Sequence, residues 1–289
     1  MDSIIVAGIQ IFCNSSKKNM LNKAKKYIEA AFQNNKNIDL IVLPEQFYQI
    51  DSNVVDNEAY GELPHKEFEE WVISCALKYN VNIIAGSYPV IEGNNIKNRC
   101  LVCDRMGNIV GKYDKIHLFD AFGIKESDTF EAGEELGLFD LDIGKIGVWI
   151  CYDTRFPEIS RSLTLMGADI LCVPAAFYRP NSDQWETLIK AASIYNVLPV
   201  VAVNQYGEFD NGRGLFGRSM ITDAKGIITA GASDKEGYFI GEIDKELQKN
   251  AEDKIRNWIT ESWIYMKDGI KTIKIQNKSM TGTKIIMVT

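Results

Sequence analysis

Apolar residues follow two patterns that alternate along the chain. Residues 4–12 and 40–43 are apolar almost throughout, which predicts buried strands, whereas residues 17–34 repeat apolar side chains at the spacing of one helical face. Because strands and helices continue to alternate in both halves of the chain, an α/β fold is expected. The pattern predicts further strands at residues 83–88, 99–103, 109–113, 146–150, 170–173, 200–203, 217–222, 227–230 and 238–243, and further helices at about residues 66–79, 157–166, 182–195 and 245–255.

The domain organisation follows from what interrupts this pattern. An irregular loop is expected at about residues 117–137, but no linker or block of like charges separates the elements, so residues 1–266 are interpreted as one domain. The tail, residues 267–289, changes character, with strand-like runs at 270–275 and 284–288. Unpaired strands need partners, so we expect this tail to lie at a sheet edge or a subunit interface.

Composition and charge exclude several kinds of partner. The chain has 289 residues, of which 46% are hydrophobic and 25% charged, as in ordinary globular proteins. A formal charge of −7 and a pI near 5.1 argue against binding to nucleic acid or to an anionic membrane, since both require a basic surface. No basic segment precedes the first apolar run and no run of about 18 apolar residues occurs. A cytoplasmic protein is therefore expected.

The six cysteines are scattered through apolar segments, which favours reduced thiols over a disulfide framework. Cys100 and Cys103 have the spacing of half a zinc site. No second pair follows, and the only histidines, His65 and His117, are not suitably spaced. Buried strand cysteines are the favoured interpretation, and no metal or other cofactor is expected.

Three reactive side chains each come directly after an expected strand or at the end of one, where α/β sheets place their ligands. Glu45 follows an apolar run and Pro44, Lys115 lies beside apolar neighbours, and Cys151 joins a strand to a helix that begins near Pro157. Each has a structural alternative: a solvated loop glutamate, a buried ion pair, and a small core residue. Functionally, they could supply a base, a cation for an oxyanion and a thiol nucleophile.

Three segments in this order resemble the signatures of the nitrilase superfamily. They are residues 43–45 (LPE), 112–119 (KYDKIHLF) and 151–158 (CYDTRFPE), which carry its glutamate, lysine and cysteine. The likeness extends over about residues 4–266. It implies a four-layer α-β-β-α sandwich, a homodimer or higher homo-oligomer, and a metal-free thiol mechanism.

The resemblance also assigns roles. Glu45 would deprotonate Cys151, whose thiolate would attack an amide carbon and form a thioester that water hydrolyses. Lys115 and the backbone N–H of Tyr152 would stabilise the oxyanion. Glu126, in the matching segment 125–133, would bind near the lysine and position the substrate. Its structural alternative is a solvated loop carboxylate.

Within the superfamily, the cysteine and lysine segments are most similar to the Nit branch, which includes the ω-amidases, so the expected substrate is a dicarboxylic acid monoamide. Arg155, Lys190 and Arg218 are candidate cations for its carboxylate, and Tyr152 and Phe177 are the other expected binding residues. Lys190 and Arg218 stand where the branch commonly has arginine and histidine. Two alternatives stay open: a nitrilase or carbamoyl-amide hydrolase with the same three residues, and a non-catalytic binding or scaffold protein.

Overall fold

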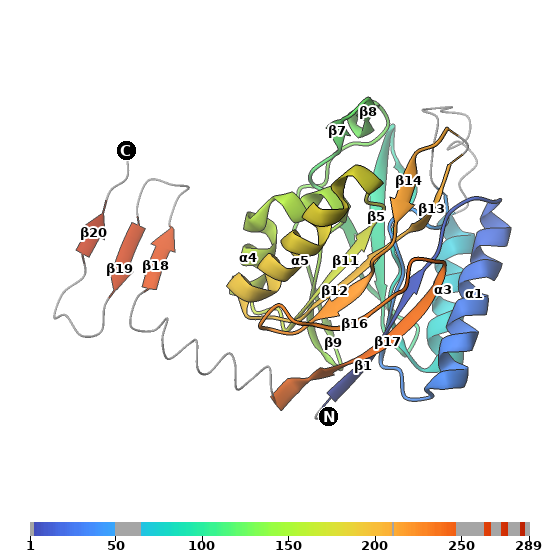
Figure 1. Cartoon of the computed structure of the whole chain (residues 1–289), viewed down its shortest axis with the longest axis horizontal. Coiled ribbons are helices and arrows are strands. Elements are labelled where there is room, and N and C mark those ends of the chain that lie inside the picture. Colours follow the sequence, from blue (N-terminus) through green and yellow to red (C-terminus); the bar gives the residue numbers. More distant parts are fainter. Residues whose placement is uncertain are drawn as a thin grey trace.

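The computed structural model describes residues 3–49, 65–209 and 211–246, together with the backbone of three short strands at residues 263–266, 273–276 and 284–286. Two main sheets pack against each other, and helices cover the outer face of each (Figure 1). The expected four-layer α-β-β-α sandwich is confirmed. No helix in the described part of the chain is long and apolar enough to cross a membrane.

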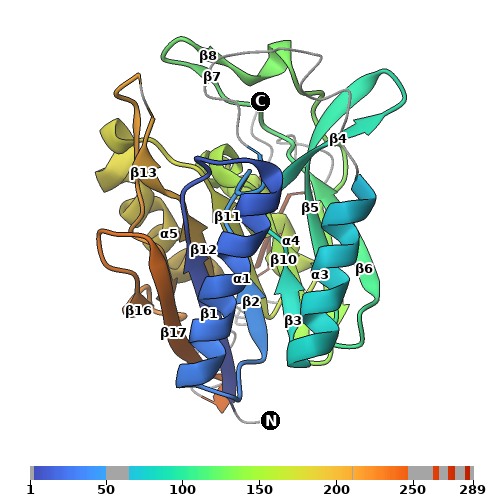
Figure 2. The ribbon, with the colours of Figure 1, turned by 90° about the vertical axis from the view of Figure 1, so that its right-hand side faces the viewer.

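The first sheet has the strand order β17-β1-β2-β3-β5-β4, with β6 also paired to β5. Helices α1 (Lys17–Asn34) and α3 (His65–Tyr79) cover its outer face (Figure 2). The strands are β1 (Ser3–Gln10), β2 (Leu40–Val42), β3 (Asn82–Ile84), β4 (Tyr88–Glu92), β5 (Asn95–Cys103), β6 (Ile109–Asp114) and β17 (Gly237–Asp244).

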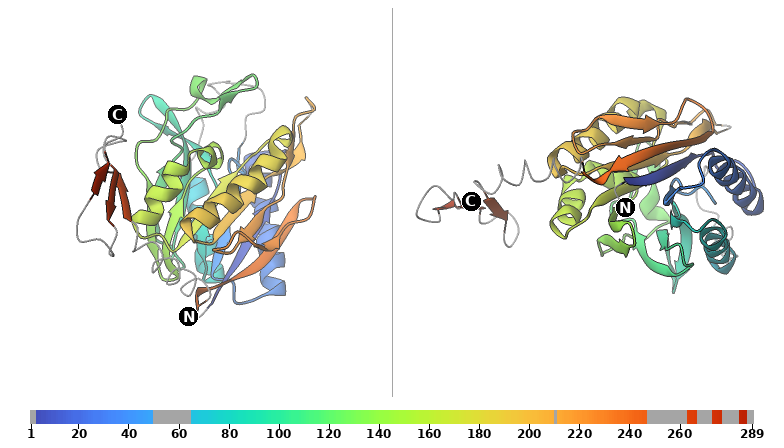
Figure 3. Two further views of the ribbon diagram at one scale, coloured as in Figure 1. Left: turned by 60° about the vertical axis from the view of Figure 1, so that its left-hand side comes forward. Right: turned by 90° about the horizontal axis from the view of Figure 1, so that it is seen from below.

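The second sheet has the order β16-β15-β12-β11-β10-β9. Helices α4 (Pro157–Leu165) and α5 (Ser182–Asn196) cover it on the other side of the molecule (Figure 3). The strands are β9 (Gly137–Leu141), β10 (Gly144–Val148), β11 (Ile170–Ala175), β12 (Val200–Asn204), β15 (Met220–Thr222) and β16 (Ile228–Gly231).

Strand β1 shows why its sequence is apolar on both faces. Ile4 and Val6 pack between the two sheets, whereas Ala7 and Ile9 pack against the helices of the outer layer. Successive side chains of a strand point to opposite faces, so a strand in an inner layer has no solvated face. The continuous apolar runs in the sequence thus reflect burial on both sides.

Most expected elements are present with ends shifted by a few residues, but the expected strand at 83–88 is wrong. It divides into β3 and β4 at Gly86, which has φ of +63°. A Cβ at this position would lie 2.1 Å from the carbonyl oxygen of Pro44. The close approach ends the strand and holds the loop that follows β2.

Two hairpins and one strand were not expected from the sequence. They are β7 (Asp120–Ala121) with β8 (Ile124–Lys125), β13 (Tyr206–Glu208) with β14 (Gly214–Phe216), and β9. The first hairpin lies in the segment interpreted as an irregular loop. Both hairpins are very short, so they carry little alternation for a pattern to reveal.

The tail forms strands that pair with one another. β19 (Ile273–Gln276) lies between β18 (Trp263–Met266) and β20 (Lys284–Ile286) in an antiparallel sheet separate from the two main ones. Strand β18 precedes residue 267 in the chain, so the expected boundary between domain and tail separates β18 from the other two strands of this sheet. The helix expected at 245–255 lies mostly outside the described residues, and the division into a domain and a tail stays a prediction.

Gly8 in β1 tests the packing between the sheets. A Cβ at Gly8 would lie 2.2 Å from the ring of Phe239 and 3.0 Å from Val203, both of which are buried. We expect Gly8→Ala to lower the free energy of unfolding by about 1–3 kcal/mol, as measured by denaturant titration, because the core must shift to accept the methyl group. Gly237→Ala, on the neighbouring strand with nothing within 4 Å of its Cβ position, is the control and should change stability much less. Equal effects would argue against overpacking.

Candidate active site

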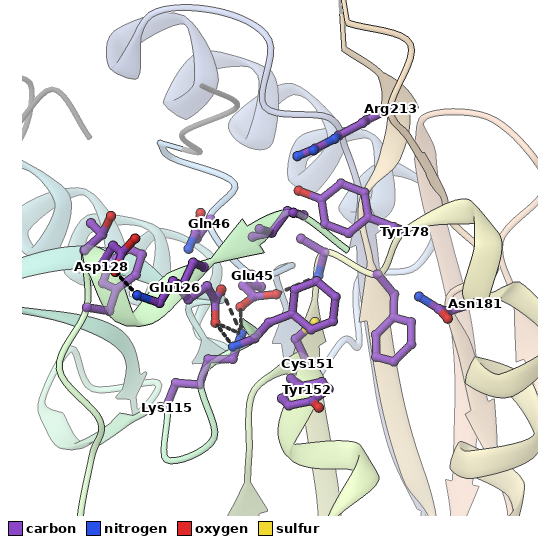
Figure 4. Close-up of a pocket in the computed structure, with 18 of the residues that line it drawn as sticks. Glu45, Gln46, Lys115, Glu126, Asp128, Cys151, Tyr152, Tyr178, Asn181 and Arg213 are labelled. Carbon is purple, nitrogen blue, oxygen red and sulfur yellow. Dashed lines mark hydrogen bonds and ion pairs between the residues drawn. The ribbon is translucent and has the colours of Figure 1, made fainter. Parts of the chain in front are cut away.

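The site lies where several strands of the two sheets end. Strand β2 runs parallel to β1 and β3, and β10 runs parallel to β11. Glu45 follows β2, Lys115 follows β6 and Cys151 follows β10. The sandwich brings all three side chains to one cavity of about 220 Å³. Figure 4 shows them together with Glu126.

Glu45 is held rigidly by its backbone and by its carboxylate. Gln205 donates a hydrogen bond from Nε2 to the carbonyl oxygen of Glu45 at 2.7 Å. Oε1 accepts hydrogen bonds from Lys115 Nζ at 2.8 Å and Asn98 Nδ2 at 3.0 Å, and Oε2 accepts one from the backbone N–H of Ala176 at 2.8 Å. The side chain is only 3% exposed, so the solvated-loop alternative does not apply.

Lys115 lies between two carboxylates. Its Nζ is 2.8 Å from Glu45 Oε1 and 2.8 Å from Glu126 Oε2, with 1% of the side chain exposed. Burial alone would lower the pKa of Lys115, but Glu126 and Glu45 outweigh it and hold the pKa well above its ordinary value. The lysine is therefore a fixed cation beside the cavity.

Glu126 reaches the lysine from the hairpin β7–β8. It begins the short 3-10 helix η1 (Glu126–Asp128), and its Oε2 accepts a hydrogen bond from the backbone N–H of Phe119 at 2.7 Å. Burial raises its pKa, and the ion pair with Lys115 opposes that shift. Glu126 thus fixes one side of Lys115 and lines the cavity.

Cys151 occupies a sharp turn between β10 and α4. Its φ is +46°, a conformation that costs energy for any residue other than glycine and that sets the side chain at the start of the 3-10 helix η2 (Cys151–Arg155). Burial and the nearby Glu45 raise the pKa of the thiol well above its ordinary value, while Lys115 and the Ala176 N–H act in the opposite direction. The resting thiol is neutral, so a nearby base is needed to activate it.

Asp153 joins the cysteine turn to the lysine segment, a role that was not assigned from the sequence. Its buried carboxylate accepts hydrogen bonds from Tyr113 Oη at 2.7 Å, from His117 N at 2.8 Å and from Ile150 N at 3.0 Å. These donors come from both sides of the site. The position two residues after the cysteine was the only signal in the sequence.

The structure brings only some of the expected binding residues to the cavity. Tyr152, Arg155 and Phe177 line it. Lys190 does not, because it lies on α5 and pairs with Glu186 one turn away at 2.5 Å. Arg218 also lies outside the lining; it is partly exposed and its closest described carboxylate is Asp183, at 3.9 Å.

Other residues line the cavity that the sequence did not indicate. Arg213, from the turn between β13 and β14, and Tyr178, from the segment after β11, lie along its upper wall in Figure 4. The turn is fixed by a hydrogen bond from the backbone N–H of Arg213 to Asn211 Oδ1 at 3.0 Å. Only the surrounding glycines, Gly212 and Gly214, marked this loop in the sequence.

The zinc alternative for Cys100 and Cys103 fails on geometry. Both lie in β5, where Cys100 packs between the sheets and Cys103 packs toward the outer helices. Thiols on opposite faces of a strand cannot bind one metal ion. No cluster of three potential metal ligands occurs among the residues that the structure describes.

The four-layer sandwich with an enclosed cysteine, glutamate and lysine defines an enzyme of the nitrilase superfamily that acts on non-peptide carbon–nitrogen bonds. The model of the carbon-nitrogen hydrolase family matches residues 5–252, so this chain belongs to that family.

Individual relatives agree with this assignment. A probable nitrilase of Schizosaccharomyces pombe is 36% identical over 245 residues, which cover 81% of this chain and 87% of that protein. A 2-oxoglutaramate amidase of Bacillus subtilis is 33% identical over 232 residues, covering 80% and 86%. The crystal structure of a carbon-nitrogen hydrolase from Helicobacter pylori superposes with a TM-score of 0.81 at 26% identity and covers 88% of this chain and 93% of that one.

Lys115→Met tests the buried ion pairs. The substitution leaves Glu45 and Glu126 facing each other without a cation, so we expect the free energy of unfolding to fall by about 3–5 kcal/mol near neutral pH. Without Lys115 the pKa of Glu126, already raised, rises further in the folded state. When the pKa of a carboxyl group is higher in the folded than in the unfolded state, the protein loses stability as the pH rises above the unfolded-state pKa. The loss of stability in Lys115→Met should therefore be larger at about pH 8 than at about pH 5.

Denaturant titrations at the two pH values measure this difference. Lys125→Met is the control, because Lys125 also lines the cavity but is 63% exposed, and Asp128 is the one carboxylate with which it pairs among the described residues. It should change stability little at either pH. A deficit for Lys115→Met that does not depend on pH would contradict the paired-carboxylate description.

Proposed function

We propose that the protein hydrolyses the amide of a small dicarboxylic acid monoamide through a cysteine thioester. The observation that carries this proposal is the contact of Lys115 with Glu45 in the cavity that Cys151 enters. A nucleophile, a base and a fixed cation are thereby available within one enclosed space. The membership of the carbon–nitrogen hydrolase family supports it.

In the first half-reaction, Glu45 takes the proton of the Cys151 thiol while the sulfur attacks the amide carbon. A carbon–sulfur bond forms and the carbonyl π electrons move to oxygen, where Lys115 and the backbone N–H of Tyr152 stabilise the negative charge. When the tetrahedral intermediate collapses, the carbon–nitrogen bond breaks and Glu45 returns its proton to the nitrogen. Ammonia leaves and a thioester remains.

In the second half-reaction, a water molecule replaces ammonia. Glu45 accepts a proton from the water as its oxygen attacks the thioester carbon, and Lys115 again stabilises the oxyanion. Collapse breaks the carbon–sulfur bond, Glu45 returns the proton to sulfur, and the acid leaves. The enzyme regains its starting protonation state.

Two guanidinium groups support a substrate with a carboxylate. Arg155 packs over the rings of Tyr152 at 5.8 Å and Phe177 at 5.5 Å, and Arg213 approaches the cavity from the turn between β13 and β14. Neither forms an ion pair with a described carboxylate. An unpaired guanidinium in a cavity wall can bind a carboxylate through two hydrogen bonds. 2-Oxoglutaramate, the substrate in the name of the Bacillus relative, carries such a group.

Cys151→Ala tests the nucleophile. We expect kcat for amide hydrolysis, measured as ammonia release, to fall by about 10³-fold or more while the protein stays folded. Cys172→Ala is the matched control, because Cys172 is fully buried in the core and does not line the cavity. It should lose some stability and keep its kcat. Substantial turnover by Cys151→Ala would refute the thioester route.

Arg155→Gln tests the preference for a carboxylate. The wild type should hydrolyse succinamate or 2-oxoglutaramate at least about tenfold better than butyramide in kcat/KM, the effect of about 1.4 kcal/mol from one charge-assisted pair. Arg155→Gln should reduce that ratio and leave butyramide turnover nearly unchanged. Arg161→Gln, at an arginine on α4 that lies outside the cavity lining, is the control.

The same panel decides between the alternatives. Faster turnover of a nitrile or a carbamoyl compound would show that the substrate is not a monoamide, and the proposed roles of the three reactive residues would stay the same. No turnover of any compound, with no labelling of Cys151 by a slow substrate, would favour the non-catalytic alternative. The expected homo-oligomer and cytoplasmic location stay predictions.

A further inference from the structure

We propose that Asn98 is a positioning residue that determines which oxygen of Glu45 receives the proton of Cys151. The inference rests on the proposed function, in which Glu45 is the base. Asn98 lies in β5, is 1% exposed, and does not line the cavity. It therefore acts on the reaction only through Glu45.

Oε1 of Glu45 has no free lone pair to accept another proton. Each carboxylate oxygen has two lone pairs, and Oε1 already accepts hydrogen bonds from Lys115 Nζ at 2.8 Å and from Asn98 Nδ2 at 3.0 Å. A proton from the thiol cannot be added at Oε1 without displacing one of these donors. While Asn98 donates this hydrogen bond, Oε1 cannot accept the proton of Cys151.

The second oxygen faces the nucleophile. Oε2 accepts one hydrogen bond, from the backbone N–H of Ala176 at 2.8 Å, which leaves one lone pair available. Ala176 lines the same cavity as Cys151, and its N–H lowers the pKa of the thiol. Because Ala176 lies against Oε2 in the cavity that Cys151 also lines, we assign the proton to Oε2.

The buried amide of Asn98 lowers the stability of the fold. Its Oδ1 is buried and accepts no hydrogen bond from any described residue, and an unsatisfied buried acceptor costs about 1–3 kcal/mol. A leucine of similar size would remove this penalty. An amide that carries this cost while its Nδ2 contacts the base points to a role in the reaction and not in folding.

Asn82 provides a matched control in the same sheet. It is also a buried asparagine that donates to a carboxylate, with Nδ2 at 2.8 Å from Asp142 Oδ1, but both of its amide atoms have partners. Asp142 lies outside the cavity lining. Replacing Asn82 should therefore affect stability, and replacing Asn98 should affect catalysis.

The experiment compares Asn98→Leu with Asn82→Leu. For Asn98→Leu we expect kcat to fall about tenfold or more with KM and Tm nearly unchanged, the scale of losing one hydrogen bond to a charged group. The acid limb of kcat/KM against pH should move to higher pH, because the carboxylate loses a donor that favours its charged form. Asn82→Leu should lower Tm and keep the kinetics of the wild type.

Alkylation of Cys151 by iodoacetamide, followed by peptide mass spectrometry, gives a readout that needs no substrate. It should be slower in Asn98→Leu than in the wild type at every pH below the plateau. If Cys151 is alkylated more slowly in Asn98→Leu but the wild type hydrolyses no amide, the positioning role is supported and the amidase proposal is refuted. Wild-type kcat, pH profile and alkylation in Asn98→Leu would overturn the inference. If this variant does not fold, Asn98→Ala undergoes the same measurements with the same two outcomes.

Discussion

The buried cation of Lys115 is the constraint on which the site depends. A lysine with 1% exposure is tolerable only when carboxylates surround it, and Glu45 and Glu126 approach it from two different segments. Those segments follow β2 and β8, so the ion pairs tie the first sheet to the hairpin that covers it. Asp153 adds a second link, from the turn after β10 to the backbone of His117. The ends of strands from both sheets are thereby fixed around one cavity.

The same arrangement explains why the thiol is neutral at rest. Two carboxylates and one ammonium group leave an excess negative charge near Cys151, and a thiolate would add another in a place that excludes water. In the proposed reaction, transfer of the thiol proton to Glu45 avoids that accumulation, because the new negative charge then develops on the substrate oxygen beside Lys115. The groups proposed to bind the oxyanion are in position before the reaction begins, so little reorganisation is needed.

The sequence predicted the residues that meet around Lys115 better than it predicted the rest of the cavity lining. Glu45 and Cys151 each follow an apolar run and Lys115 has apolar neighbours, and the resemblance of their three segments to the nitrilase superfamily then distinguished them from their structural alternatives. Lys190 was expected in the cavity, but the rotation of a helix about its axis decides where a side chain points, and α5 turns this one toward Glu186. Arg213 and Asn98 were missed because their contacts depend on pairing between distant segments, which no local pattern records. The separation of β3 from β4 was missed for the same reason, since it follows from the approach of Pro44 to Gly86.

The cavity is built from two kinds of structure, strand ends and a hairpin turn. The groups proposed to make and break bonds stand at strand ends, where buried hydrogen bonds such as that from Ala176 to Glu45 hold them. Arg213 stands instead in the exposed turn of the hairpin β13–β14, whose strand β14 is itself buried. In the proposed function the reactive residues identify the class of reaction, whereas Arg213 in the hairpin turn and Arg155 in the cysteine turn select the molecule on which it is performed.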